Sequence, residues 1–228
     1  ISQLGFAAEG LGQAFTNPYE FVSGGLFSHT IGEVGNGNEK GFSTSREGKS
    51  GAVFEYLDFG EFGSDEIIIP VFALDNAAYE IELWEGDPLQ GGTLIDTLHY
   101  QKPSIWNVYQ EETWKLPKRL KGLKTLAFLL TNQKVHIKGF SFKRQEKAFA
   151  TLFAAECDAV YGDTFTREVE AVNGIGNNVT LVFENMNFGE KGATGVEICS
   201  RSPLKGNTVH VQFTTKEGTV LRRALEIP

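Results

Sequence analysis

The chain repeats a ten-residue phrase at long range. Phe54–Gly63 returns as Phe183–Gly192, a shift of 129 positions, and six of the ten positions are identical. A shorter echo places the Phe-Ala-Ala-Glu of residues 6–9 again at residues 153–156. A period this long is typical of a duplicated domain, not of a solenoid of small repeats. The sequence therefore predicts two related domains, with extra residues between the two echoes in the first copy.

The two copies differ in how much chain follows the repeated phrase. The first copy continues through residues 64–142, whereas the second has only residues 193–228. We therefore predict a whole domain over residues 1–145 and a second, truncated copy over residues 146–228. We expect its closing strands either to lie outside this sequence or to be supplied by another chain segment, because an unclosed sheet would expose edges that pair readily with other chains.

Period-two patterning predicts that both copies are built from strands. Residues 79–83 (Tyr-Glu-Ile-Glu-Leu) alternate apolar and charged side chains, and residues 209–213 (Val-His-Val-Gln-Phe) repeat this pattern in the second copy. Residues 67–69 and 125–130 are short apolar runs typical of buried strands, and turns such as residues 86–88 separate the runs. No segment shows a sustained helical stripe. The expected fold is all-β, with tandem jelly-roll β-sandwiches of which the second is incomplete.

Composition excludes several classes of function. A net charge of −8 argues against binding to nucleic acid, whose phosphates attract basic surfaces. The chain contains no apolar run near the roughly 20 residues that a membrane-spanning helix requires, so no membrane partner is expected. It also lacks the nucleophile elbow, the HExxH motif, the P-loop and the dinucleotide-binding glycine pattern.

Glycoside cleavage requires a pair of carboxylates, and two recurring glutamates give only a superficial suggestion of such a pair. Glu55 and Glu61 recur as Glu184 and Glu190. Their recurrence in both copies, beside the same Phe-Gly turn, fits a structural role better than a catalytic one. We expect a non-catalytic domain.

Several ordered segments of the first copy carry a family resemblance. In chain order they are Ala8-Glu9, Gly41-Phe42, Ser50–Tyr56, Tyr79–Leu83, Gly91–Ile95, Trp106 and His136–Phe142. In their order and spacing they resemble carbohydrate-binding module family 6, the jelly-roll modules attached to polysaccharide-degrading enzymes. The resemblance covers nearly all of the first copy.

Other phrases suggest a parent protein. Tyr161–Phe165, Ile175–Val179, Ile198–Pro203 and Trp106–Thr113 resemble the C-terminal tandem modules of bacterial glycoside hydrolase family 2 enzymes, the β-galactosidase group. This resemblance implies a piece of a large glycosidase, with the catalytic domain of that enzyme as a partner. For such a piece we favour an extracellular or cell-surface location over the bacterial cytoplasm.

The family resemblance implies a sugar site at the loop end of the sandwich. Its matching positions are Phe42, Trp106 and His136, which supply two aromatic faces and one polar group. Alternatives remain open at each position. Trp106 could be a core tryptophan, Phe42 could make no ligand contact, and His136 could be merely solvated because it alternates with Val135 and Ile137.

A second place for sugar in this family is the concave sheet face. Trp84 and Trp114 sit on the polar-facing positions of their strands and could supply it. They could equally cover the flank of the sandwich against a neighbouring domain, and we favour that packing role.

Many family members hold a structural calcium ion with a first-strand Glu and a last-strand Asp. In the first copy Lys138 stands where the Asp is expected, so calcium is not expected beside Glu9. The second copy keeps Glu156 and Asp158, which are hard oxygen ligands. We therefore name them as candidate calcium ligands, with a solvated acidic edge as the alternative; no other cofactor is expected.

Two functional hypotheses follow. In the first, the chain is a non-catalytic carbohydrate-binding region that holds a glycoside hydrolase on a polysaccharide or oligosaccharide through aromatic stacking, an avidity effect. In the alternative, the domains are structural and pack on the catalytic domain or mediate oligomerisation without touching sugar.

Overall fold

The computed structural model describes residues 15–204 and 206–227. The first Phe-Ala-Ala-Glu segment, and with it Ala8 and Glu9, lies outside the described residues. The chain divides into two compact units, Ile1–Met186 and Asn187–Pro228. The domain boundary between residues 145 and 146 remains a prediction from the sequence. Among the described residues, no helix has the length and apolar character needed to cross a membrane.

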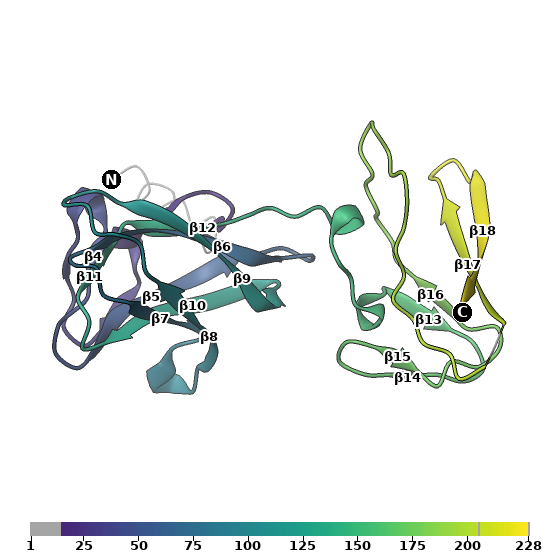
Figure 1. The fold of residues 1–228 in the computed structure, drawn as a ribbon, viewed down its shortest axis with the longest axis horizontal. Coiled ribbons are helices and arrows are strands. Elements are labelled where there is room, and N and C mark those ends of the chain that lie inside the picture. The colour runs from purple at the N-terminus through teal and green to yellow at the C-terminus, as the bar shows by residue number, and fades with distance from the viewer. Residues whose placement is uncertain (1–14, 205, 228) are drawn as a thin grey trace, which may run out of the picture. The chain divides into compact units, whose positions relative to one another are not determined.

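Two antiparallel sheets of the larger unit form a β-sandwich over residues 22–142 (Figure 1). The all-β prediction is confirmed. One sheet has the order β2 (His29–Ile31), β5 (Lys49–Asp58), β10 (Leu123–Thr131), β7 (Tyr79–Glu85) and β8 (Thr93–Tyr100). The other has the order β1 (Val22–Ser23), β12 (Gly139–Phe142), β6 (Ser64–Ala73), β11 (Val135–Ile137), β4 (Phe42–Ser43) and β3 (Gly35–Asn36), and β9 (Gln110–Leu120) also pairs with β6.

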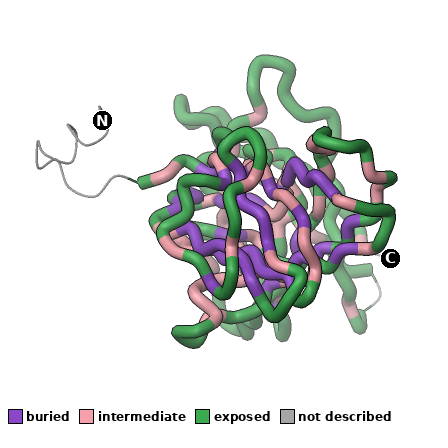
Figure 2. The backbone as a smooth tube through the Cα atoms, turned by 90° about the vertical axis from the view of Figure 1, so that its left-hand side faces the viewer, coloured by how far each residue is buried: buried purple, intermediate pink, exposed green. Residues whose placement is uncertain are grey.

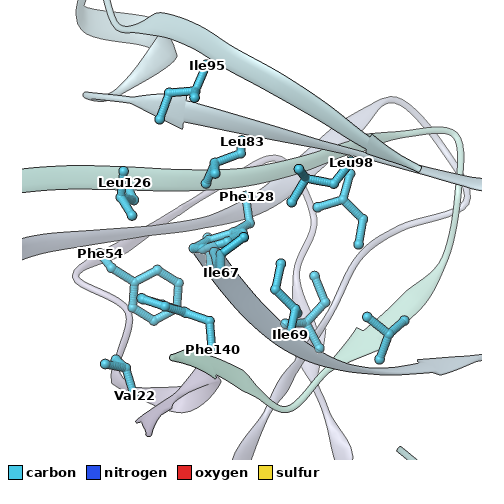
Figure 3. Packing of buried hydrophobic residues seen from close by; sticks show 14 of the residues in the cluster. Val22, Phe54, Ile67, Ile69, Leu83, Ile95, Leu98, Leu126, Phe128 and Phe140 are labelled. Atoms are coloured by element: carbon cyan, nitrogen blue, oxygen red, sulfur yellow. The ribbon is translucent and has the colours of Figure 1, made fainter. Parts of the chain in front are cut away.

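The core lies between the two sheets, and its side chains come from alternate positions of both (Figure 3). Phe54 and Phe128 of one sheet meet Phe140 of the other, with ring centroids 5.0 and 4.8 Å from that of Phe140. Figure 2 shows the buried strand segments inside and the exposed connections outside. The alternation predicted for β7 is confirmed, because Ile81 is buried while Glu80 is exposed. Burial of this apolar surface drives the sheets together.

Three-residue 3-10 helices lie in the connections. They are η1 (Gly24–Leu26), η2 (Asn38–Lys40), η3 (Pro88–Gln90), η4 (Lys147–Phe149) and η5 (Ala154–Glu156). Their shortness agrees with the lack of a sustained helical pattern in the sequence. Of these, η2 lies at the loop end of the sandwich and η4 lies in the connector, which we define as residues 143–153.

The repeated phrase forms the same turn in both copies. The N–H of Gly60 donates to Oδ1 of Asp58 at 2.9 Å, and the N–H of Gly189 donates to Oδ1 of Asn187 at 3.0 Å. Both glycines are left-handed, with φ of 66° and 60°, a conformation that glycine adopts without strain. The conservative Asp-to-Asn exchange keeps the accepting oxygen that this turn requires.

Strand pairings of the first copy also recur. β13 (Ala159–Tyr161) pairs with β16 (Thr180–Val182) as β2 pairs with β5, and β14 (Thr166–Arg167) pairs with β15 (Val172–Asn173) as β3 pairs with β4. In the smaller unit, β17 (Asn207–Thr214) and β18 (Val220–Ile227) form an antiparallel pair like β7 and β8. The repeated segments therefore share local turns and strand pairings, whereas the duplication of a whole domain remains a prediction from the sequence.

Candidate functional site

Trp106 is an exposed ring on the loop between β8 and β9. Its side chain is 80% exposed, so it is not a core tryptophan. The indole is nevertheless held in place, because it makes an edge-to-face contact with Phe72 of β6 at a centroid distance of 5.7 Å. An exposed but anchored indole offers a flat apolar face to solvent.

Phe72 lies at the centre of the site. Its neighbours Val71 and Ala73 point into the core, so Phe72 points to the outer face of its sheet. It is only 2% exposed there because Trp106, Tyr109 and His136 surround it. The sequence interpretation missed Phe72 and gave Tyr109 no role in the site. The available signal was an apolar side chain at an outward position of β6, where polar residues are usual.

Asn38 of the η2 turn forms hydrogen bonds with several residues of the site. Its main-chain N–H donates to Nδ1 of His136 at 3.4 Å, and its carbonyl accepts from the Tyr109 hydroxyl at 2.8 Å. Its side-chain Nδ2 donates to Oδ1 of Asn107. The two residues that follow it, Glu39 and Lys40, are left-handed with φ of 52° and 64°. Such strained residues persist where surrounding contacts hold them.

The hydrogen bond from Asn38 also sets the tautomer of His136. Because Nδ1 accepts, the proton of the neutral ring lies on Nε2, which is then a donor. Burial lowers the pKa of His136 from its ordinary value of 6.5, and the nearby Lys134 lowers it further. The ring is therefore neutral at pH 7.

One ion pair also lies beside the site. Lys138 pairs with Glu39 at 2.5 Å, and its ammonium lies 5.7 Å from the centroid of the Tyr109 ring. Burial, with a smaller effect of Glu39, raises the pKa of Tyr109 to about 12, so the phenol stays protonated. Rings, amides and a neutral imidazole suit a polar, uncharged ligand.

Phe42 lies beneath this surface and not on it. Its ring has no exposed area and packs in the core 6.3 Å from the ring centroid of Phe54. Its main chain pairs with Ile137, next to His136. Phe42 therefore supports the strand that carries His136, and its ring does not face solvent.

The two other tryptophans make packing contacts. Trp84 covers a small apolar cluster on the outer face of the five-stranded sheet that includes Val53 and Leu129, and its Nε1 donates to Glu82 at 2.8 Å. Trp114 packs at the edge of the core, and its Nε1 donates to the carbonyl of His99 at 3.1 Å. Both sets of contacts lie within the sandwich itself, so packing of these rings against a neighbouring domain remains a prediction.

Glu156 and Asp158, the candidate calcium ligands, are each paired with a lysine. Oε1 of Glu156 accepts from Lys121 at 2.8 Å, and Oδ2 of Asp158 accepts from Lys147 at 2.7 Å. Burial raises the pKa of Glu156, but the Lys121 bond and the Phe153 amide outweigh it and lower the pKa overall. In the described part of the chain, no three His, Cys, Asp or Glu side chains gather for a metal. With these lysines in place the two carboxylates do not fit a calcium ion. A structural calcium ion in the second copy remains a prediction from the sequence.

Comparison with known proteins gives matches among solved structures only. No family model and no curated protein matches the chain. A family 6 carbohydrate-binding module, studied for its binding sub-sites, is similar at 18% identity and a TM-score of 0.49, covering 59% of this chain and 100% of that module.

Two further modules are similar over slightly shorter parts of the chain. A family 6 module from Clostridium cellulolyticum, solved with xylose, has 18% identity and a TM-score of 0.47, covering 57% of this chain and all of the module. A family 36 module, solved with calcium and xylotriose, has 11% identity and a TM-score of 0.43, covering 54% of this chain and 99% of the module. At these identities, none of the likenesses assigns a ligand to this chain.

Proposed function

We propose that the loop-end surface binds a glycan without cleaving it. We define this surface by Asn38, Trp106, Asn107, Tyr109 and His136. The observation that carries the proposal is the exposed indole of Trp106, which is held edge-on by Phe72. A sugar ring presents an apolar C–H face that packs on such an indole, while its hydroxyls require neighbouring donors and acceptors.

The loop-end surface supplies polar groups of the right kind. Nε2–H of His136 is a donor, and the amides of Asn38 and Asn107 offer both donors and acceptors. Since His136 is neutral and Glu39 is paired with Lys138, a neutral sugar needs no counter-charge here. Glycoside cleavage needs two carboxylates facing each other across the sugar, and Glu39 is tied up in its ion pair. A binding role fits these groups better than a catalytic one.

In the full proposal, the chain is an accessory region of a glycoside hydrolase. The phrases shared with family 2 enzymes support such a parent, and a bound glycan would keep its catalytic domain near substrate by raising the effective concentration. Polysaccharide or oligosaccharide and the parent catalytic domain are then its partners, in an extracellular or cell-surface setting. The rival function is packing against another domain through the same exposed indole.

Affinity electrophoresis of the chain through gels containing neutral polysaccharides tests the proposal. We expect retardation by at least one of xylan, mixed-linkage glucan and galactan. Trp106→Ala should weaken binding by about tenfold or more, the equivalent of about 1.4 kcal/mol. Trp84→Phe is the matched tryptophan control and should bind as the parent chain does. Absence of retardation by every polysaccharide, or equal retardation of Trp106→Ala, would favour the packing function.

A further inference from the structure

The β17–β18 hairpin of the smaller unit has one apolar face. The two strands form a sheet of their own (Figure 1), and their register places Val209 opposite Leu225 and Phe213 opposite Leu221. Residues that lie opposite each other in an antiparallel pair share a face. We call this side the hairpin face; its members are apolar apart from one arginine, and they are Val209, Val211, Phe213, Leu221, Arg223 and Leu225.

The hairpin face is far more exposed than the corresponding face of the first sandwich. Phe213 and Leu221 are 37% and 49% exposed, although the ring of Phe213 contacts that of Phe188 at a centroid distance of 5.8 Å. In the β7–β8 pair, Ile81 and Leu98 lie opposite each other and are fully buried. Contiguous apolar side chains that remain exposed mark an interaction site.

β17 also has an unpaired edge. Within residues 15–204 and 206–227, it pairs with β18 and with no other strand. Proteins protect such edges with lysines, prolines or bulges, and β9, an edge strand of the first sandwich, carries Lys115, Pro117 and Lys118. β17 contains no Lys, Arg, Asp, Glu or Pro, and it pairs with β18 without a register shift. Its edge is therefore open to another strand.

The first sandwich shows which kind of strand occupies such an edge. β7 begins 25 residues after Phe54, and β17 begins 24 residues after Phe183, so both strands have similar places in the repeat. On its edge away from β8, β7 pairs antiparallel with β10, and Phe128 lies opposite Leu83 with both side chains buried. The partner that suits this edge is an antiparallel strand with large apolar side chains.

We propose that the free edge of β17 binds an extended partner segment, which adds a third, antiparallel strand to the hairpin. In this mode of recognition main-chain hydrogen bonds supply affinity, and alternate side chains supply specificity. The partner segment carries large apolar side chains at every second position, as β10 does at Leu126, Phe128 and Leu130. These side chains lie beside the hairpin face and shield its edge from water. The proposal rests on the repeat and does not depend on glycan binding.

The other face of the hairpin sets the remaining positions of the partner segment. His210 and Gln212 of β17 lie on this face, and both are exposed. Polar side chains therefore suit the alternate positions of the partner segment, because they stay in water beside these two residues. The partner segment is an amphipathic strand.

The test is an NMR titration of the full chain with a synthetic peptide. The probe has the sequence of residues 123–131 with Ala127→Thr and Leu129→Lys, which keeps one apolar face and makes the other polar. We expect saturable shifts of the main-chain amide signals of β17, with a dissociation constant of about 0.1 mM or lower. The same peptide with Phe128→Asp should bind about tenfold more weakly or worse, because a carboxylate replaces its apolar centre.

Two N-methylated peptides test the main-chain hydrogen bonds. Successive N–H groups of a strand point to opposite edges, so methylation of the nitrogen at position 127 blocks one edge of the peptide and methylation at position 128 blocks the other. We expect at least one of these peptides to lose its binding. If both bind as well as the unmethylated peptide, the peptide is not held as a strand, and the proposal is overturned.

Two variants of the chain test the hairpin face. Val211→Asp places a carboxylate on this face and should weaken peptide binding by about tenfold or more. His210→Asp, on the opposite face of the same strand, is the matched control and should bind as the parent chain does. If Val211→Asp prevents the hairpin from folding, the methylated peptides decide, since they leave the chain unchanged.

Three further results would overturn the proposal. One is that about 1 mM peptide, well above the expected dissociation constant, leaves the β17 signals unshifted. Another is that folded Val211→Asp and His210→Asp chains bind the peptide alike. The third is that the chain without peptide sediments as a dimer whose β17 amides are already protected from hydrogen exchange, because a second copy then occupies the edge.

Discussion

The main-chain N–H of Asn38 donates to Nδ1 of His136 across 3.4 Å, joining a turn and a strand that lie 98 residues apart in the sequence. This one bond assigns the imidazole tautomer and anchors the turn whose carbonyl holds Tyr109. The loop-end surface therefore depends on His136 remaining neutral, and several predictions about it can be tested.

Glycan binding should weaken as the pH falls. Burial lowers the pKa of His136 from 6.5, so the folded chain resists protonation there more than the unfolded chain does. This contribution to stability is complete above about pH 6.5 and is lost as the pH falls through the folded pKa. Protonation also converts Nδ1 into a donor, which breaks its bond from Asn38. Affinity measured by calorimetry should fall about tenfold between about pH 7.5 and 5. His136→Gln, whose amide does not titrate, should show a flat profile, and an equally steep profile in this variant would assign the effect to another group.

Removal of the Tyr109 hydroxyl should remove one hydrogen bond that holds the η2 turn, while the aromatic ring stays in place. Tyr109→Phe keeps the contact with Phe72 but loses the hydrogen bond to Asn38, a typical contribution of about 0.5–1.5 kcal/mol. We expect a severalfold loss of glycan affinity, smaller than that of Trp106→Ala, by calorimetry. A loss larger than that of Trp106→Ala would instead indicate that the hydroxyl contacts the ligand directly.

Phe42 should matter for folding and not for ligand contact. Because its ring is fully buried, Phe42→Ala should lower the free energy of unfolding by about 3–5 kcal/mol in urea. Phe42→Leu fills most of the same volume and should fold and keep its glycan affinity. A Phe42→Leu chain with normal stability and no binding would show that the phenyl ring acts on the ligand after all.

Gly41 allows the main chain before β4 to pack closely against β11. A Cβ atom there would collide with the carbonyl oxygen of Ile137 and lie 2.9 Å from Cα of Lys138. Gly41→Ala should therefore lower the free energy of unfolding by about 1–3 kcal/mol, as overpacking does, and weaken glycan binding. Gly195→Ala is the control, since nothing lies within 4 Å of its added Cβ. Equal unfolding midpoints for the two variants would refute the close approach at Gly41.

Calcium can bind Glu156 and Asp158 only if it displaces two lysines. We expect millimolar calcium to leave the melting temperature of the parent chain unchanged, since the ammonium groups of Lys121 and Lys147 compete at 2.8 and 2.7 Å. The Lys121→Met, Lys147→Met double variant removes the competition and is the chain in which calcium should raise the melting temperature. Stabilisation of the parent chain by calcium, and its reversal by a chelator, would show that the lysines do not block the ion.

Much of the fold was readable from the chain because it follows from local rules. The alternation at Tyr79–Leu83 identifies a half-buried strand wherever that strand is placed, since neighbouring side chains point to opposite faces. The repeated phrase predicted a shared structure, and the Asp58–Gly60 and Asn187–Gly189 turns are alike because each uses a side-chain acceptor and a left-handed glycine. The sequence could not tell which strands pair with one another, because pairings such as that of β6 with β11 join segments that are far apart in the chain.

The candidate site was only partly readable for the same reason. Trp106 and His136 were named from a family resemblance, and that resemblance alone could not separate an exposed indole from a core one. Phe42 was named with them, although the packing of the two sheets places its ring in the core. Asn38 and Phe72 carry no motif, and their importance comes from neighbours far away in the chain.

The sequence by itself determined that this protein is strand-built and carries a long-range repeat, without the motifs of the catalytic classes considered. Only the tertiary structure decided which side chains share a surface. The period-two pattern of a strand assigns each side chain to one of the two faces of its sheet. Which side chains then meet on that face, or at the adjoining loops, depends on pairings between residues tens of positions apart in the chain. That is why the rings around Phe72 could be recognised as one surface only once the sheets were assembled.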